Sequence, residues 1–263
     1  MAVPGSRVEG TPPPDVAGAE LFATDAYLRS FDSTVLEVDR EQGRIVLART
    51  AFYPGGGGQP PDLGELTWSG VTAPVTKVQR EGGRIWHWLD TSELPASGTE
   101  LFGSIDWTRR HLLMRTHTAL HILCGVIWTE FQIPVTGGNM DPGRGRLDFP
   151  LDSMSVELGQ RVEARINEEI ERAREIVVEF LGRSDADLDE SLIRTAANLI
   201  PREIDPLRVI DIVGLDRQAD GGTHVANTAD VGRVAVTGTE SKGKGNKRIR
   251  IEVRDAQSTE NRS

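Results

Sequence analysis

The sequence contains one cysteine, Cys124, so no disulfide can form within the chain. No apolar run approaches the ~20 residues that a membrane-spanning helix needs, and residues 1–18 lack the apolar stretch of a signal peptide. The net charge of −10 excludes a chain that is basic over its whole surface. We therefore expect a cytoplasmic protein, not bound to membranes, that meets any nucleic acid through a local basic patch.

The length of 263 residues is enough for one large or two modest domains. Residues 1–18 combine proline, glycine and charge without an apolar period, which predicts a flexible tail. Residues 19–105 contain short alternating segments separated by glycine, proline and serine turns, which predicts a β-barrel-like domain or a sandwich. Within this part lies the run Gly55–Gln59, GGGGQ, which by itself indicates a tight turn between strands.

Residues 106–263 have a mixed pattern. The stretch RRHLLMRTHTALHILCGVIWTEF predicts a long buried helix, and Ser155 is expected to cap a second, amphipathic one. The segments EIVVEFL, RVIDIVGL, RVAVTG and KRIRIEV are typical of strands. The whole chain is therefore predicted to belong to the α+β class.

Two pairs of residues have spacings that suit a metal ion. His117 and His121 lie four apart on the predicted helix, so their rings project from one face about 6 Å apart. The residue after His117 is threonine, so a metalloprotease of the HExxH type is disfavoured. Asp220 and His224 repeat the spacing in the loop DGGTH. Alternatively, Asp220 caps a turn and His224 packs beneath it.

Several separated motifs resemble those of one family. They are FYPGGGGQPPDLG, DWTRRHLLMRTHTALHIL, QADGGTHVANTADVG and KGKGNKRIRIEV, which together extend the match from about residue 20 to 255. In these strings the chain resembles the freestanding alanyl-tRNA editing proteins, relatives of the editing domain of alanyl-tRNA synthetases. The resemblance implies a β-barrel-like domain followed by an α/β two-layer editing domain of the threonyl/alanyl-tRNA synthetase type. It also implies hydrolysis of serine, and in some members glycine, from alanine tRNA.

The resemblance also assigns roles to residues. It implies one zinc ion held by His117, His121, His224 and the position of Asp220, where the family has cysteine. Carboxylate is an acceptable but weaker zinc ligand than thiolate, so Asp220 either binds the ion or leaves three histidines with an open position. Cys124 cannot replace it beside His117, because seven helical residues rise ~10.5 Å.

For substrate recognition, the resemblance matches Gly56, Gly57, Gly58 and Gln59 to the family's glycine-rich motif and Thr136 to its serine-sensing threonine. Gln59 and Thr136 are the candidate catalytic residues. Thr136 could equally be a turn hydroxyl before a glycine.

Five positive charges without an acid lie between Ser241 and Arg250. They are Lys242, Lys244, Lys247, Arg248 and Arg250. Such a hairpin can serve solubility alone, but beside the resemblance we expect these residues, with Arg109 and Arg110, to contact tRNA phosphates.

The leading hypothesis is a zinc-dependent deacylase acting in trans on Ser-tRNA(Ala), with Gly-tRNA(Ala) as a further substrate. Two alternatives remain: an inactive relative that only binds tRNA, and a metal-dependent esterase for a small substrate without RNA. The sequence does not determine the oligomeric state, although a monomer is favoured.

Overall fold

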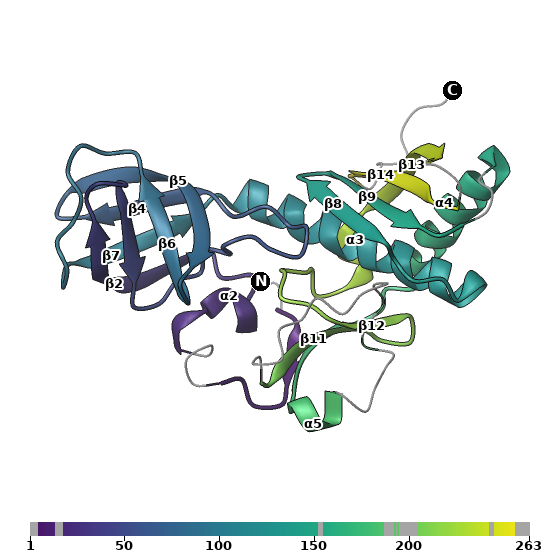
Figure 1. Cartoon of the computed structure of the whole chain (residues 1–263), viewed down its shortest axis with the longest axis horizontal. Helices are drawn as coiled ribbons and strands as arrows, with labels where there is room; N and C mark the ends of the chain where they lie inside the picture. The colour runs from purple at the N-terminus through teal and green to yellow at the C-terminus, as the bar shows by residue number, and fades with distance from the viewer. Residues whose placement is uncertain are drawn as a thin grey trace. The chain divides into compact units, whose positions relative to one another are not determined.

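The computed structural model describes residues 5–13, 18–151, 155–186, 192, 194, 205–241 and 245–255. The chain forms two compact units. We call them the barrel unit, Pro12–Leu112 with Gly221–Thr223, and the sheet unit, Met1–Thr11 with Leu113–Asp220 and His224–Ser263. Figure 1 shows the strands and helices of each, and the predicted α+β class is confirmed. Among the described residues, no helix has both the length and the apolar character needed to cross a membrane.

Six antiparallel strands close the barrel in the order β2-β3-β6-β5-β4-β7. Alternation along the sequence explains the closure, since in β7 Leu101 and Ile105 are buried while the residues between are exposed or glycine. Phe52 lies in the barrel core, where its ring meets Phe31 and His87 edge-on. The predicted β-barrel is thus confirmed. Its strands are β2 (Ser30–Asp39), β3 (Arg44–Leu47), β4 (Gly64–Trp68), β5 (Val71–Glu81), β6 (Arg84–Leu89) and β7 (Glu100–Ile105), preceded by the short helix α2 (Leu21–Thr24).

The sheet unit contains two four-stranded sheets. The first has the order β1-β10-β11-β12, and its strands are β1 (Arg7–Glu9), β10 (Ile176–Leu181), β11 (Leu207–Ile212) and β12 (Asp216–Ala219). The second has the order β13-β14-β9-β8, and its strands are β13 (Arg233–Ser241), β14 (Lys247–Arg254), β9 (Arg144–Phe149) and β8 (Gly137–Asp141). The helices are α3 (Trp107–Phe131), α4 (Val156–Glu171), α5 (Arg183–Ala186) and the 3-10 turn η2 (Thr228–Val231).

Helix α3 is buried around most of its circumference beyond Leu112, and glycines allow both neighbouring strands to approach it. A Cβ on Gly145 of β9 would lie 2.9 Å from the Leu120 side chain. A Cβ on Gly125 would lie 2.9 Å from Leu215, the residue before β12. Strands from both sheets therefore pack against α3. Ser155 caps α4 as expected, with its hydroxyl accepting from the Leu158 amide at 3.1 Å.

The expectation of a loose tail over residues 1–18 is wrong for Arg7–Glu9. These residues form β1, which pairs in parallel with Val177, Val178 and Glu179 of β10. All three residues are exposed, so burial of their side chains does not explain why they form a strand. The unpaired edge of β10 supplies backbone hydrogen-bonding partners, which a search for apolar periodicity does not detect.

Candidate metal centre

His117 and His121 lie on α3 and point to one side of it. The predicted helix is present, and the two ring centroids are 5.1 Å apart. Cys124, one turn further along, belongs to the same face. All three side chains are buried, so this face of α3 meets protein and not solvent.

Strand β12 lies opposite that face. Because side chains alternate along a strand, Asp216, Gln218 and the following Asp220 project to one side. Their contacts confirm this: Asp216 bonds His121, Gln218 bonds the Cys124 sulfur at 3.4 Å, and the Asp220 carboxylate lies 3.7 Å from Nε2 of His117. One strand thus carries two carboxylates to two histidines of the same helix.

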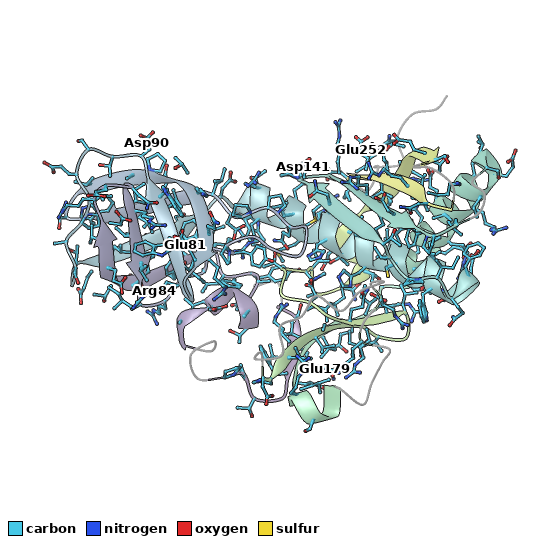
Figure 2. All side chains as sticks on the ribbon, in the orientation of Figure 1. Glu81, Arg84, Asp90, Asp141, Glu179 and Glu252 are labelled. Atoms are coloured by element: carbon cyan, nitrogen blue, oxygen red, sulfur yellow. The ribbon has the colours of Figure 1, made fainter. Side chains whose placement is uncertain are left out.

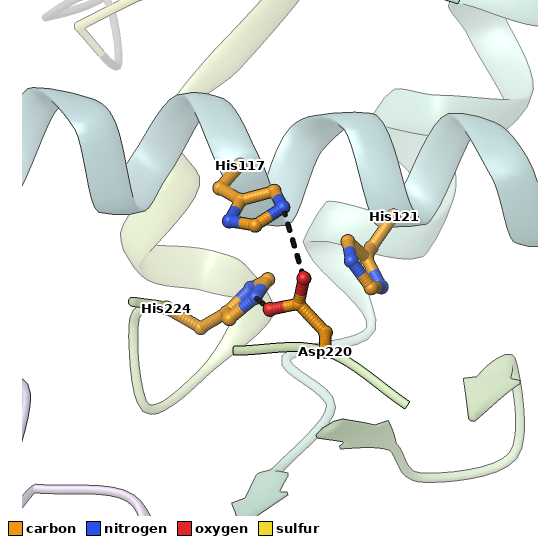
Figure 3. A group of neighbouring side chains, drawn as sticks. All are labelled: His117, His121, Asp220 and His224. Carbon is orange, nitrogen blue, oxygen red and sulfur yellow. Dashed lines mark hydrogen bonds and ion pairs between the residues drawn. The ribbon is translucent and has the colours of Figure 1, made fainter. Parts of the chain in front are cut away.

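His224 completes the group from the loop after β12. Its ring centroid lies 4.3 Å from that of His117 and 4.8 Å from that of His121. One atom from each of His117, His121, Asp220 and His224 lies within 4.8 Å of the others. Figure 3 shows Asp220 between the rings, with Oδ2 at 3.0 Å from Nε2 of His224. The two pairs that lie a hundred residues apart in the sequence are therefore brought together.

The donors fit a divalent metal ion. Three imidazoles and one carboxylate are a donor set that zinc and similar ions accept in tetrahedral sites. Nδ1 of His121 lies 3.0 Å from Asp216, and Nδ1 of His224 lies 3.2 Å from the Thr118 hydroxyl. When these partners hold a proton on Nδ1, the lone pair of Nε2 can bind a metal ion, which is the arrangement found around metal-binding histidines.

Electrostatics favour a cation here. Burial lowers the pKa of His117 to about 4 and holds the pKa of His224 well below its usual 6.5. Burial also opposes ionisation of Asp220, but His117 and His224 outweigh it and keep that carboxyl pKa well below 3.8. At neutral pH, His117 and His224 therefore face the centre as neutral imidazoles and Asp220 as a carboxylate, as metal binding requires. Burial also lowers the pKa of His121, but its hydrogen bond to Asp216 and the charges of Asp216 and Asp220 together outweigh burial and raise that pKa above 6.5.

Comparison with known proteins decides the family. Models of the threonyl and alanyl tRNA synthetase second additional domain and of class II (A) tRNA synthetases match residues 207–250 and 24–109. The alanyl-tRNA editing protein AlaX-M of Saccharolobus solfataricus is 36% identical over 237 residues, which cover 89% of this chain and 98% of that protein. The chain belongs to the AlaX-M family of alanyl-tRNA editing proteins.

Two further relatives agree with this. AlaX-M of Methanosarcina barkeri is 33% identical over 87% of this chain and 96% of its own length. The alanine--tRNA ligase of Pyrococcus furiosus is 34% identical over 87% of this chain, but the match spans only 25% of that ligase. The chain thus matches the editing proteins over nearly their whole length and the ligase over a quarter of its length.

The glycine run forms a tight turn. Gly56 and Gln59 exchange both backbone hydrogen bonds, at 3.0 and 2.9 Å, and all four glycines have positive φ. The Gln59 side chain is buried; its Nε2 donates to the Thr223 hydroxyl at 2.8 Å and its Oε1 accepts from the Thr223 amide at 3.0 Å. Gln59 therefore holds the residue that precedes His224 in the sequence.

Thr136, the other candidate catalytic residue, is exposed just before β8. Its hydroxyl donates to Oδ1 of Asn246 at 3.2 Å, and its amide donates to the carbonyl of Asp148. These contacts fix the start of β8.

The expected role of Arg110 is wrong. Its side chain is fully buried in the barrel unit, where Nε donates to both carboxylate oxygens of Asp62 at 2.9 and 3.0 Å. Its other nitrogens donate to the carbonyls of Ala26 and Ala51. A guanidinium enclosed in this way has no surface to offer a phosphate. Arg109 remains half-buried, with its guanidinium donating to the carbonyl of Pro61 at 3.2 Å.

The basic hairpin carries less free charge than its sequence indicates. Arg248 forms a two-point ion pair with Asp148, Arg250 pairs with Glu240, and the side chain of Lys247 is largely buried. A further acid, Glu252, lies on β14 itself (Figure 2). Lys242 and Lys244 lie outside the described residues.

Sequence reasoning missed Asp216 and Thr118, the partners of His121 and His224. Thr118 was considered only as the residue that rules out a protease. Asp216 stands four residues before Asp220, the same spacing as in the histidine pair, and this was the one signal available. Cys124 is a free, buried cysteine.

Proposed function

We propose that the chain is a zinc-dependent deacylase that hydrolyses Ser-tRNA(Ala), and Gly-tRNA(Ala), after release from the synthetase. The observation that carries the proposal is the buried group His117, His121, Asp220 and His224 in a chain that matches AlaX-M proteins over their whole length. We place the reaction in the cytoplasm, with a monomer as the active form.

Each part of the site has a task in this proposal. The four residues of the metal group would hold a zinc ion, which would polarise the ester carbonyl, acidify a water molecule or orient the aminoacyl group. Asp220 lies between the rings of His117 and His224. Asp216 contacts Nδ1 of His121, and Thr118 contacts Nδ1 of His224. Since an aminoacyl ester is already activated, positioning can supply most of the rate enhancement.

Selection against alanine requires a polar contact to the serine hydroxyl. When alanine is bound instead, each buried polar group that it leaves without a partner raises the binding free energy by about 1–3 kcal/mol. We propose Thr136 for this contact and the backbone of Gly56, Gly57 and Gly58 for the aminoacyl group. Within the described residues, the amides of Gly57 and Gly58 donate no hydrogen bond, and both glycines are exposed. Gln59 is bound to Thr223, which supports a role in holding this loop beside the substrate.

For tRNA phosphates we propose Arg109, Lys247, Arg248 and Arg250, with Lys242 and Lys244. The ion pairs of Arg248 and Arg250 reduce the charge that these two can contribute. We therefore expect the double change Lys242→Ala with Lys244→Ala to flatten the salt dependence of tRNA binding most. Arg84→Ala, an exposed residue of β6 (Figure 2), is the control and should leave the slope unchanged.

The deciding experiment measures deacylation of Ser-tRNA(Ala), Gly-tRNA(Ala) and Ala-tRNA(Ala), with and without a chelator. We expect release of serine, slower release of alanine, and loss of activity on chelation that zinc restores. Binding of tRNA without release of any amino acid would instead favour the inactive tRNA-binding relative. Equal activity on a truncated serine ester without RNA would favour the small-molecule esterase.

A further inference from the structure

The carboxylate of Asp216 lies outside the four-residue metal group and touches it only through His121. It lies at the start of β12 with its side chain fully enclosed. One oxygen, Oδ2, lies 3.0 Å from Nδ1 of His121 and accepts from Gln218 at 2.6 Å. The other, Oδ1, accepts no hydrogen bond from the described residues.

The second oxygen argues against a purely structural role. Oδ1 lies 3.7 Å from Nε of Arg194, and that nitrogen is also buried without a hydrogen bond among the described residues. Ionic groups enclosed for stability alone normally satisfy their hydrogen bonds, because each unsatisfied one is costly. Of the two hydrogen-bond partners of Asp216, Gln218 and His121, only His121 belongs to the metal group.

Asp216 and Asp220 contact different nitrogens of the histidine rings. Asp220 reaches Nε2 of both His117 and His224, on the side of the rings that faces the group centre. Asp216 instead reaches Nδ1 of His121, the nitrogen on the other side of that ring. An acid in this position accepts a hydrogen bond from Nδ1 and fixes the ring plane. It also makes Nε2 a stronger ligand for a metal ion.

We propose that Asp216 is a positioning residue for metal binding: it orients His121 and increases the affinity of the His117, His121, Asp220 and His224 group for a divalent ion. This inference rests on the proposed function in so far as that function places a metal ion in the group. It assigns Asp216 no contact with the ion or the substrate.

Three full-length variants test the proposal: Asp216→Ala, Asp216→Asn and the control Asp211→Asn. Asp211 is a part-buried acid of β11, opposite Arg217 in the strand register and outside the metal group. The measurements are the dissociation constant for Zn²⁺, from competition with a coloured chelator, and the visible absorption of Co²⁺ bound to each protein. Urea unfolding of the metal-free proteins reports folding.

We expect Asp216→Ala to weaken Zn²⁺ binding by about 10- to 100-fold and to alter the Co²⁺ spectrum. Asp216→Asn keeps an oxygen that can accept from Nδ1, so it should recover part of the affinity. Asp211→Asn should bind like the wild type.

Wild-type affinity in a folded Asp216→Ala protein would overturn the proposal. It would also be overturned if Asp216→Asn and Asp211→Asn lost affinity equally, because the effect would then not pass through His121. These readouts need no tRNA, so failure of deacylation does not affect them. A wild-type protein that binds no ion would overturn both this inference and the zinc-dependent function.

Discussion

The composition of the metal group is set by single residues, and Asp220 is the most informative. Its two oxygens lie 3.7 Å from Nε2 of His117 and 3.0 Å from Nε2 of His224, so it already sits where a ligand would be needed. Zinc binds a thiolate more tightly than a carboxylate, because the carboxylate is the harder ligand. The residue at position 220 should therefore tune the affinity for the ion.

We expect Asp220→Cys to bind Zn²⁺ about tenfold more tightly or better, because thiolate suits zinc more than carboxylate does. Competition titrations would measure this, with Asp220→Asn as the variant that loses the charge and weakens binding. Equal Zn²⁺ affinities in all three proteins would mean that Asp220 is not a ligand.

A second single-residue effect concerns stability in the barrel unit. Burial lowers the pKa of His87 to about 4, and its Nε2 lies 2.9 Å from the Thr50 hydroxyl. The unfolded chain binds this proton near 6.5. Because the folded pKa is the lower one, the stabilisation is complete above pH 6.5 and is lost as the pH falls toward 4.

We predict that His87 accounts for about 2 kcal/mol of the loss in unfolding free energy between pH 7 and pH 5. Urea unfolding at both pH values would show this as a shallower pH dependence in His87→Gln than in the wild type. Other buried histidines titrate in both proteins and cancel in the comparison. Identical pH dependence in the two would contradict the prediction.

At the scale of elements, the contact between α3 and the start of β12 controls the site. Gly125 lies where the helix passes Leu215 and Asp216, and a Cβ there would come within 2.9 Å and 3.1 Å of their side chains. Alanine usually favours a helix by about 1 kcal/mol over glycine, but this close approach reverses the preference.

We expect Gly125→Ala to lower the unfolding free energy by about 1–3 kcal/mol. It should also weaken Zn²⁺ binding, because the strand that carries Asp216 must move. The control is Gly18→Ala, where a Cβ meets nothing within 4 Å. A stabilised Gly125→Ala protein would show that the strand yields without cost.

Elements also show where sequence patterns succeed and fail. Alternation predicted the strands of the barrel, because it reflects burial of one face of each strand. The long apolar run predicted α3, because it reflects burial around the helix. The strand β1 was missed since its three exposed residues depend on pairing with β10. Arg110 was misassigned because a helix start looks exposed until Asp62 is placed against it.

At the scale of the whole molecule, the metal group connects α3 with a loop about a hundred residues later. An ion that binds only the folded state adds stability by mass action, about 2.7 kcal/mol at a free concentration one hundred times the dissociation constant. The gain should appear in the sheet unit, which contains all four residues of the group.

We therefore expect chelation to accelerate hydrogen exchange in α3 around His117 and His121 and in β12. Exchange in the barrel strands, such as β6, serves as the internal control and should stay the same. Mass spectrometry of peptides after exchange would measure both. Unchanged exchange in α3 would show that no ion stabilises this unit.

The sequence by itself determined the α+β class, the barrel strands and the buried helix, because burial leaves periodic patterns. Its spacing also indicated two candidate ligand pairs, and the family resemblance implied that they form one site. Only the tertiary structure decided that Asp216 and Thr118 support His121 and His224, that Gln59 holds Thr223, and that Arg110 is enclosed. The physical reason is that each of these depends on a partner 48 to 164 residues away in the chain, and the chain order does not encode which polar side chains meet.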